Sequence, residues 1–147
     1  MNAGQGRSIR LSVLMLPLLL AGLGCGELAV LPTEPEPDID PSATFTRVQN
    51  EIFTPTCTVI GCHDTVGQQE GLVLTPDSSF ASIVDVPSRQ VPSLDRVEPG
   101  DPAASYLYRK VTGSSIVGER MPFASPALTD AQMQLVRNWI LRGAPND

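Results

Sequence analysis

The centre of this sequence reads Cys57-Thr58-Val59-Ile60-Gly61-Cys62-His63. Two cysteines stand here with four residues between them, and the second is followed directly by the only histidine of the chain. A cysteine pair followed at once by histidine is typical of covalent haem attachment, for which the usual signature is C-x-x-C-H. In such a site the thiols form thioethers with the haem and the histidine binds its iron.

The spacing between these cysteines is two residues longer than usual, which changes the expected geometry. On a helical turn, cysteines three positions apart project about 60° from each other, whereas cysteines five positions apart project about 140° from each other. The chain must therefore bulge or unwind between Cys57 and Cys62. Gly61 permits such a bend, because glycine adopts backbone angles that other residues resist.

Two other fates are open to the same residues. Outside the cytoplasm, Cys57 and Cys62 could pair as a disulfide, which at this short separation would stabilise the domain by about 2 kcal/mol. A disulfide gives no role to His63, and this favours haem. Zinc would need a fourth ligand, and neither a further histidine nor a further cysteine is free after residue 25.

The N-terminal segment has the residue order of a secretory signal. Arg7 and Arg10 precede an apolar run over residues 11–24 that ends at Cys25. The run is too short and too interrupted by Gly and Pro for a transmembrane helix. Because small residues lead directly into a cysteine, residues 1–24 resemble a bacterial lipoprotein signal. That resemblance implies cleavage before Cys25, a lipid on this cysteine, and a protein anchored in the cell envelope, facing the periplasm or the cell surface.

The next segment, residues 25–43, is rich in proline and acidic residues, and we expect it to be a disordered, semi-rigid tether. The remaining residues, 44–147, have the length of one globular domain. Loss of residues 1–24, which carry two arginines and no acid, would lower the net charge from −6 to −8. Such an acidic protein should not bind nucleic acid.

The domain is predicted to be all-α, with about four helices and long ordered loops. The first helix, over 44–53, places Phe45, Val48 and Ile52 on one face and leads into Cys57. A second covers 79–84. For the third, Asp101 is expected as N-cap, with an end at Gly113. Between these two helices, the prolines at 87, 92 and 99 favour an ordered covering loop.

The last helix has the clearest local signals. Thr129 is its predicted N-cap and Gln132 the partner in a capping box, while Gly143 marks the end. Leu128 and Met133 fit a hydrophobic staple. Its apolar residues predict a broad buried face made of Met133, Leu135, Val136, Trp139 and Ile140.

A haem iron bound by His63 needs a sixth ligand from the opposite side. Met121 lies before the last helix in Gly118-Glu119-Arg120-Met121-Pro122-Phe123, a loop whose proline could hold a thioether in place. Methionine paired with histidine raises the haem potential. Met133 is the competing thioether, but its place on the apolar stripe favours packing.

The order helix, Cys…Cys-His, covering loop, helix, Met-Pro loop, terminal helix resembles the class I cytochrome c domain, and especially its planctomycete-type and myxobacterial lipoprotein relatives. The likeness spans about residues 45–145, and its most specific parts are Gly61-Cys62-His63 and the passage from Arg120-Met121-Pro122 to Trp139-Ile140. The resemblance implies one covalent haem c per chain. Cys57 and Cys62 would anchor this haem, with His63 as its proximal ligand and Met121 as its distal ligand.

The expected function is that of an electron carrier rather than an enzyme, working between redox partner proteins that the sequence does not identify. The membrane would be reached through the lipid on Cys25. The alternatives are a haem-free cytochrome-like lipoprotein with a Cys57–Cys62 disulfide, acting as a binding or structural module, and a haem domain that reports ligand or redox state. Arg89 and Arg96 could pair with haem propionates, but such arginines are more often solvated. Trp139 and Phe123 could pack on a haem face, but the expectation for both is packing in the core.

Overall fold

The computed structural model describes residues 38–147. The predicted signal peptide over 1–24, the lipid anchor at Cys25 and most of the tether over 25–43 lie outside the described residues, and they stay predictions. In the part of the chain that is described, no helix is both long enough and apolar enough to cross a membrane.

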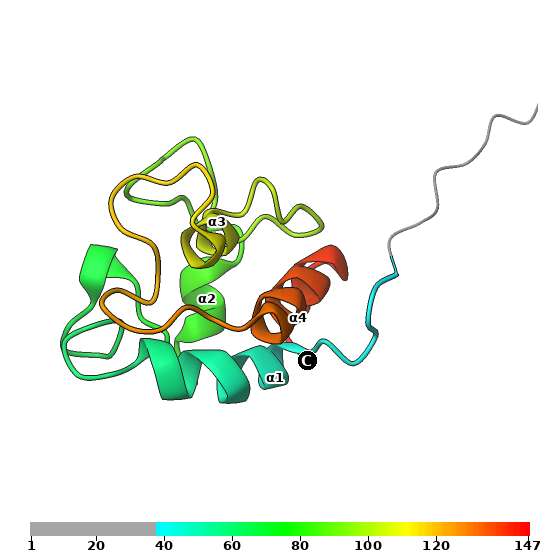
Figure 1. The fold of residues 1–147 in the computed structure, drawn as a ribbon, viewed down its shortest axis with the longest axis horizontal. Coiled ribbons are helices and arrows are strands. Elements are labelled where there is room, and N and C mark those ends of the chain that lie inside the picture. The colour runs from blue at the N-terminus through cyan, green and yellow to red at the C-terminus, as the bar shows by residue number, and fades with distance from the viewer. Residues whose placement is uncertain (1–37) are drawn as a thin grey trace, which may run out of the picture. The chain divides into compact units, whose positions relative to one another are not determined.

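The described chain is helical (Figure 1). Residues 38–147 form no strand, and only three isolated backbone pairings join their loops. The all-α expectation is therefore confirmed for this part of the chain. The helical elements in order are α1 (Phe45–Val48), η1 (Gln49–Cys57), η2 (Gln69–Gly71), α2 (Ser79–Ile83), α3 (Tyr106–Thr112) and α4 (Asp130–Leu141).

The first helix runs, as predicted, into the cysteine loop. Thr44 caps α1 by accepting a hydrogen bond from the Arg47 N–H, and η1 follows without a break. The turns of η1 are wider than those of an α-helix, as in the bond from the Thr58 N–H to the Phe53 carbonyl at 3.1 Å. Pro55 lies inside η1 and accounts for the widening, because proline lacks an N–H and its ring crowds the carbonyl four residues earlier.

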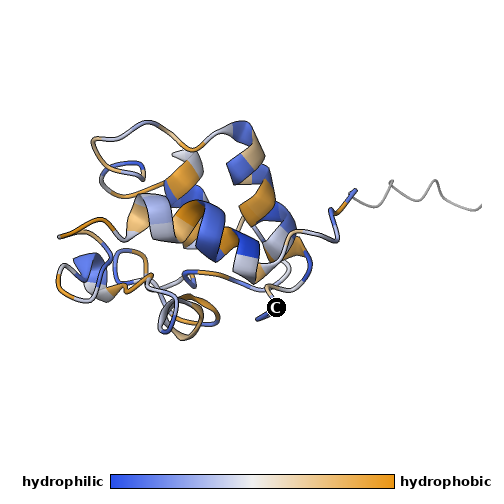
Figure 2. Cartoon of the chain, turned by 90° about the horizontal axis from the view of Figure 1, so that it is seen from below, coloured by the Kyte–Doolittle hydropathy of each residue, from blue (hydrophilic) through white to orange (hydrophobic). Residues whose placement is uncertain are grey.

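The predicted ends of α4 are confirmed. Thr129 and Gln132 form the capping box, and Gly143 follows the helix in the left-handed region with φ of +89°. The predicted face is buried at Leu135, Val136, Trp139 and Ile140, while Met133 is half-buried against the same core. Figure 2 shows the corresponding alternation of hydrophobic and hydrophilic residues along the helices.

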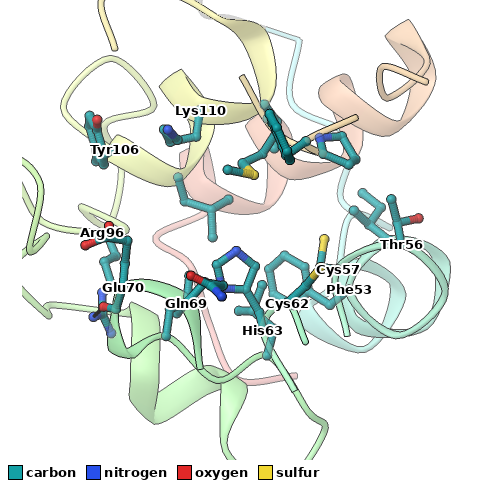
Figure 3. Close-up of a pocket in the computed structure, with 18 of the residues that line it drawn as sticks. Phe53, Thr56, Cys57, Cys62, His63, Gln69, Glu70, Arg96, Tyr106 and Lys110 are labelled. Carbon is teal, nitrogen blue, oxygen red and sulfur yellow. Dashed lines mark hydrogen bonds between the residues drawn. The ribbon is translucent and has the colours of Figure 1, made fainter. Parts of the chain in front are cut away.

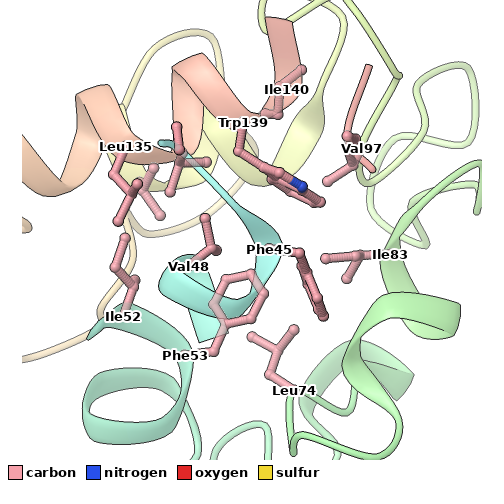
Figure 4. Packing of buried hydrophobic residues seen from close by; sticks show 14 of the residues in the cluster. Phe45, Val48, Ile52, Phe53, Leu74, Ile83, Val97, Leu135, Trp139 and Ile140 are labelled. Carbon is pink, nitrogen blue, oxygen red and sulfur yellow. The ribbon is translucent and has the colours of Figure 1, made fainter. Parts of the chain in front are cut away.

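Phe45 is the centre of the hydrophobic core (Figure 4). Its ring lies 5.2 Å from that of Phe80, 5.4 Å from that of Trp139 and 6.4 Å from that of Phe53, between ring centroids. These aromatic contacts join α1 to η1, α2 and α4. The indole N–H of Trp139 is satisfied by the Pro145 carbonyl at 2.9 Å, so the largest core side chain is buried without a polar penalty.

The C-terminal residues return to the start of α1, where Figure 1 marks the chain end. The Asp147 carboxylate accepts from the Phe45 N–H at 2.8 Å, and its backbone carbonyl accepts from the Thr46 N–H at 2.9 Å. Arg142 donates to the Ala43 carbonyl at 2.6 Å. Otherwise unpaired N–H groups of the first helical turn are thereby satisfied by the last residue.

The predicted start of the third helix was wrong. Asp101 does cap a turn, accepting from the Ala104 N–H at 3.0 Å, but α3 begins only at Tyr106. Ser105 has an extended backbone and separates this turn from α3, and its hydroxyl donates to the Asp101 carbonyl at 2.8 Å. A serine that bonds local backbone in this way competes with helix formation. The predicted end at Gly113, with φ of +80°, is confirmed.

Candidate functional site

A cavity of about 450 Å³, within the size range of ligand pockets, is lined by residues of η1, η2, α3 and α4 and of the loops between them. Its lining includes all four predicted cofactor residues, Cys57, Cys62, His63 and Met121, which come from three separate segments. Apolar side chains make up much of the remaining wall, among them Ile52, Phe53, Leu72, Leu74, Leu107, Val111 and Val136. The cysteine–histidine motif and the distant Met121 therefore line the same cavity.

The cysteine loop is closed by backbone contacts. The His63 N–H donates to the Cys57 carbonyl at 3.1 Å, which brings the two ends of the loop together. Gly61 has φ of +85°, so the bend expected at this glycine is present. Further bonds from the Gln69 N–H to the Cys62 carbonyl and from the Leu74 N–H to the His63 carbonyl hold the loop against the next segment.

His63 points into the cavity (Figure 3). Its Nδ1 is buried without a hydrogen-bond partner, which is uncommon for a buried nitrogen. Burial lowers the pKa of His63 below its ordinary value of 6.5, although backbone groups of Leu72 and Gln69 partly oppose this shift. The imidazole is therefore neutral at pH 7, which is the form that binds metal ions.

The two cysteines are both half-buried and are not joined to each other in this structure. Burial, followed by the proximity of Cys62, raises the pKa of the Cys57 thiol to about 12. Within residues 38–147, no three His, Cys, Asp or Glu side chains come together as a metal-binding group.

Met121 reaches the cavity from the loop between α3 and α4. Its N–H donates to the Lys110 carbonyl at 2.8 Å, so this loop is attached to α3. The competing Met133 is absent from the cavity wall and packs against the core instead. Of the two methionines considered, only Met121 is placed to reach a group in the cavity.

Part of the cavity wall is polar and carries more positive than negative side chains. Arg89, Arg96 and Lys110 line it together with Glu70, Ser88, Gln69 and Gln90. Arg96 already donates to the carbonyls of Ser82 at 2.7 Å, Glu70 at 3.1 Å and Gly71 at 3.3 Å. Arg89 makes no such bonds among the described residues, but its guanidinium packs closely on Gly71. The covering loop predicted between α2 and α3 therefore does line the cavity.

The two aromatic residues expected in the core differ. Trp139 is fully buried there, as predicted. Phe123 is 65 % exposed and lines the cavity, so its assignment to the core was wrong. The reason is its position two residues after Met121, on a loop that contributes no buried residue between Gly113 and Ala127.

Sequence reasoning missed two cavity residues on α3, Tyr106 and Lys110. Both are nearly buried, at 4 % and 9 % exposure, and both face the cavity in Figure 3. Their spacing of one helical turn and the fact that Lys110 is the only lysine of the chain were the available signals.

Comparisons of this chain with known protein families, with curated proteins and with solved structures found no match.

Proposed function

We propose that this chain is an exported, lipid-anchored c-type cytochrome that carries single electrons with one covalent haem per chain. The observation that carries the proposal is the cavity, because Cys57, Cys62, His63 and Met121 all line it. A motif that arose by chance would have no reason to share a pocket with a methionine some sixty positions away in the chain.

The chemistry of the residues fits the group. Haem would supply reversible one-electron exchange at its iron. Neutral His63 offers an imidazole nitrogen, and Met121 offers a soft thioether. The buried Nδ1 of His63 has no hydrogen-bond partner, so the imidazole brings an unsatisfied nitrogen to the cavity.

The polarity of the cavity supports the same proposal. Haem is an amphiphile, with an apolar ring and two carboxylates. The apolar wall around Phe53, Leu72 and Val136 suits the ring, while Arg89, whose guanidinium makes no hydrogen bond among the described residues, suits the carboxylates. Because Arg96 is engaged with three carbonyls, we assign it to fixing the wall rather than to binding a propionate.

The chain's own residues would exclude water and limit reactivity. If His63 and Met121 both held the iron, they would leave it no position for a small molecule, so we infer electron relay rather than catalysis. Lipid anchorage at Cys25 would confine the carrier to the envelope, where its donor and acceptor are redox partner proteins.

The test is a pyridine haemochrome spectrum with intact mass, on full-length protein exported from a host that attaches haem c. We expect one covalent haem per chain. Cys57→Ser with Cys62→Ser should abolish attachment, whereas Met133→Leu, a matched control outside the cavity, should not. A haem-free mass lighter than the reduced chain by one pair of hydrogen atoms would instead identify the Cys57–Cys62 disulfide and overturn the proposal.

A further inference from the structure

Met121 lies on a segment that has no buried residue of its own. From Gly113 to Ala127 every residue is exposed or half-buried, and Val117 is 55 % exposed. Such a segment gains little from apolar burial, and segments of this kind open at low free-energy cost. The position of Met121 must therefore be fixed by polar contacts.

Two side chains on α3 supply these contacts. The Tyr106 hydroxyl accepts a hydrogen bond from the Val117 N–H at 3.0 Å, and Lys110 Nζ donates to the Val117 carbonyl at 3.1 Å. Residues one turn apart share a helix face. Tyr106 and Lys110 thereby occupy both backbone polar groups of a single loop residue.

The backbone of Lys110 adds a third contact, since its carbonyl accepts from the Met121 N–H at 2.8 Å. The Tyr106 hydroxyl also lies 3.4 Å from the Val117 carbonyl, and within the described residues no further hydrogen bond reaches residues 115–127 from outside that range. The attachment of this loop thus depends on two residues of one helix.

Lys110 is costly to bury, which indicates a specific role. It is 9 % exposed and forms no ion pair with any described carboxylate. Its compensation comes from the Val117 carbonyl and from the Tyr106 ring, whose centroid lies 6.0 Å from Nζ. Tyr106 is itself oriented by donating to the Gln90 side chain at 3.1 Å.

We propose that Tyr106 and Lys110 form a clamp that holds Met121 at the cavity and so controls whether its thioether can act as an iron ligand. The ligand part of this inference rests on the proposed function. The clamp itself is a statement about the loop, and it can be tested whether or not haem is attached.

The first experiment measures amide hydrogen exchange at Val117 and Met121 in the full chain as purified. In the double variant Tyr106→Phe with Lys110→Met, both amides should exchange about tenfold faster for each lost bond. Tyr108→Phe on the same helix and Arg137→Met on α4 are the matched controls, because neither side chain contacts the loop through a hydrogen bond. Unchanged exchange in the double variant would overturn the clamp.

The second experiment uses the haem-loaded protein. Tyr106→Phe removes a hydroxyl without changing the charge of the protein. It should weaken the methionine–iron charge-transfer absorption, lower the haem potential, and let carbon monoxide bind the reduced protein. Lys110→Met should have the same spectral effects. Lys110→Gln, whose amide can still donate to the Val117 carbonyl, should restore part of the wild-type absorption and reduce carbon monoxide binding. The potential of the Lys110 variants is not a test, because loss of a nearby cation lowers it directly.

The two proposals fail differently. Absence of covalent haem would reject the proposed function and leave the exchange result to decide the clamp. Haem present in both clamp variants, with wild-type absorption and no carbon monoxide binding, would reject the control of Met121 while the electron-carrier proposal stands.

Discussion

Gly67 packs directly on the cysteine loop, so a methyl group there should displace the loop. A Cβ at this position would lie 2.3 Å from the Gly61 carbonyl carbon and 2.6 Å from the Cys62 oxygen. Backbone atoms cannot rotate away as a side chain can, and the loop would have to move by about 1 Å to restore an ordinary contact. We expect Gly67→Ala to lower the free energy of unfolding by about 1–3 kcal/mol and to shift His63, which follows Cys62.

Gly61→Ala is the matched control on the same loop. Its added Cβ would meet nothing within 4 Å, but the φ of +85° would cost about 1–2 kcal/mol. Urea unfolding alone cannot separate the two variants. The distinguishing signal is the NMR resonance of His63, the only histidine, together with haem content. Gly67→Ala should change both, and Gly61→Ala should change neither. Wild-type values for Gly67→Ala would refute the close packing on which this reasoning depends.

Three further outcomes are expected. Met121→Ala should remove the methionine–iron absorption with little loss of stability, whereas Met133→Ala should cost about 1–2 kcal/mol of unfolding free energy and leave the spectrum unchanged. In haem-free protein, the lowered pKa of His63 means that the unfolded state binds the proton first. Stability measured by urea unfolding should therefore be fully present above about pH 6.5 and fall below it, a dependence that His63→Gln should remove. In a haem-free Cys62→Ser variant, burial, the larger cause of the raised pKa of the Cys57 thiol, remains. This thiol should therefore be alkylated at pH 8 far more slowly when folded than in urea, as peptide mass spectrometry would show.

The helices were predictable where their signals are local. Thr129, Gln132 and Gly143 delimit α4 through contacts within a few residues of the chain. The start of α3 was not predictable in this way, because its first N–H groups are satisfied from elsewhere. Tyr106 donates to the Asp95 carbonyl and Leu107 to the Arg96 carbonyl, both in the covering loop. A helix capped by a distant segment does not need the cap that its own sequence offers.

The candidate site shows the same division. The motif at 57–63 and the Met-Pro pair nominate residues by pattern, and the cavity contains them. The hydrogen bonds that Arg96, Tyr106 and Lys110 make depend on which backbone groups lie near their side chains in the folded chain. Arg96 was considered as a propionate partner, yet its guanidinium bonds three carbonyls of two other segments. No pattern of residue types reveals such contacts, since backbone groups are the same at every position.

The return of the chain end to α1 has a mechanical consequence. A pull applied at residue 38 would load the contacts of Asp40 and Ser42 with Arg47, and then those of residues 43–46 with residues 142–147. These bonds join the outer ends of α1 and α4, which pack against each other through Phe45 and Trp139. Tension would therefore pass from the first helix into the last, and the loops that carry His63 and Met121 lie outside this line of force. The domain could bear strain on its N-terminal side without altering the geometry of its cavity.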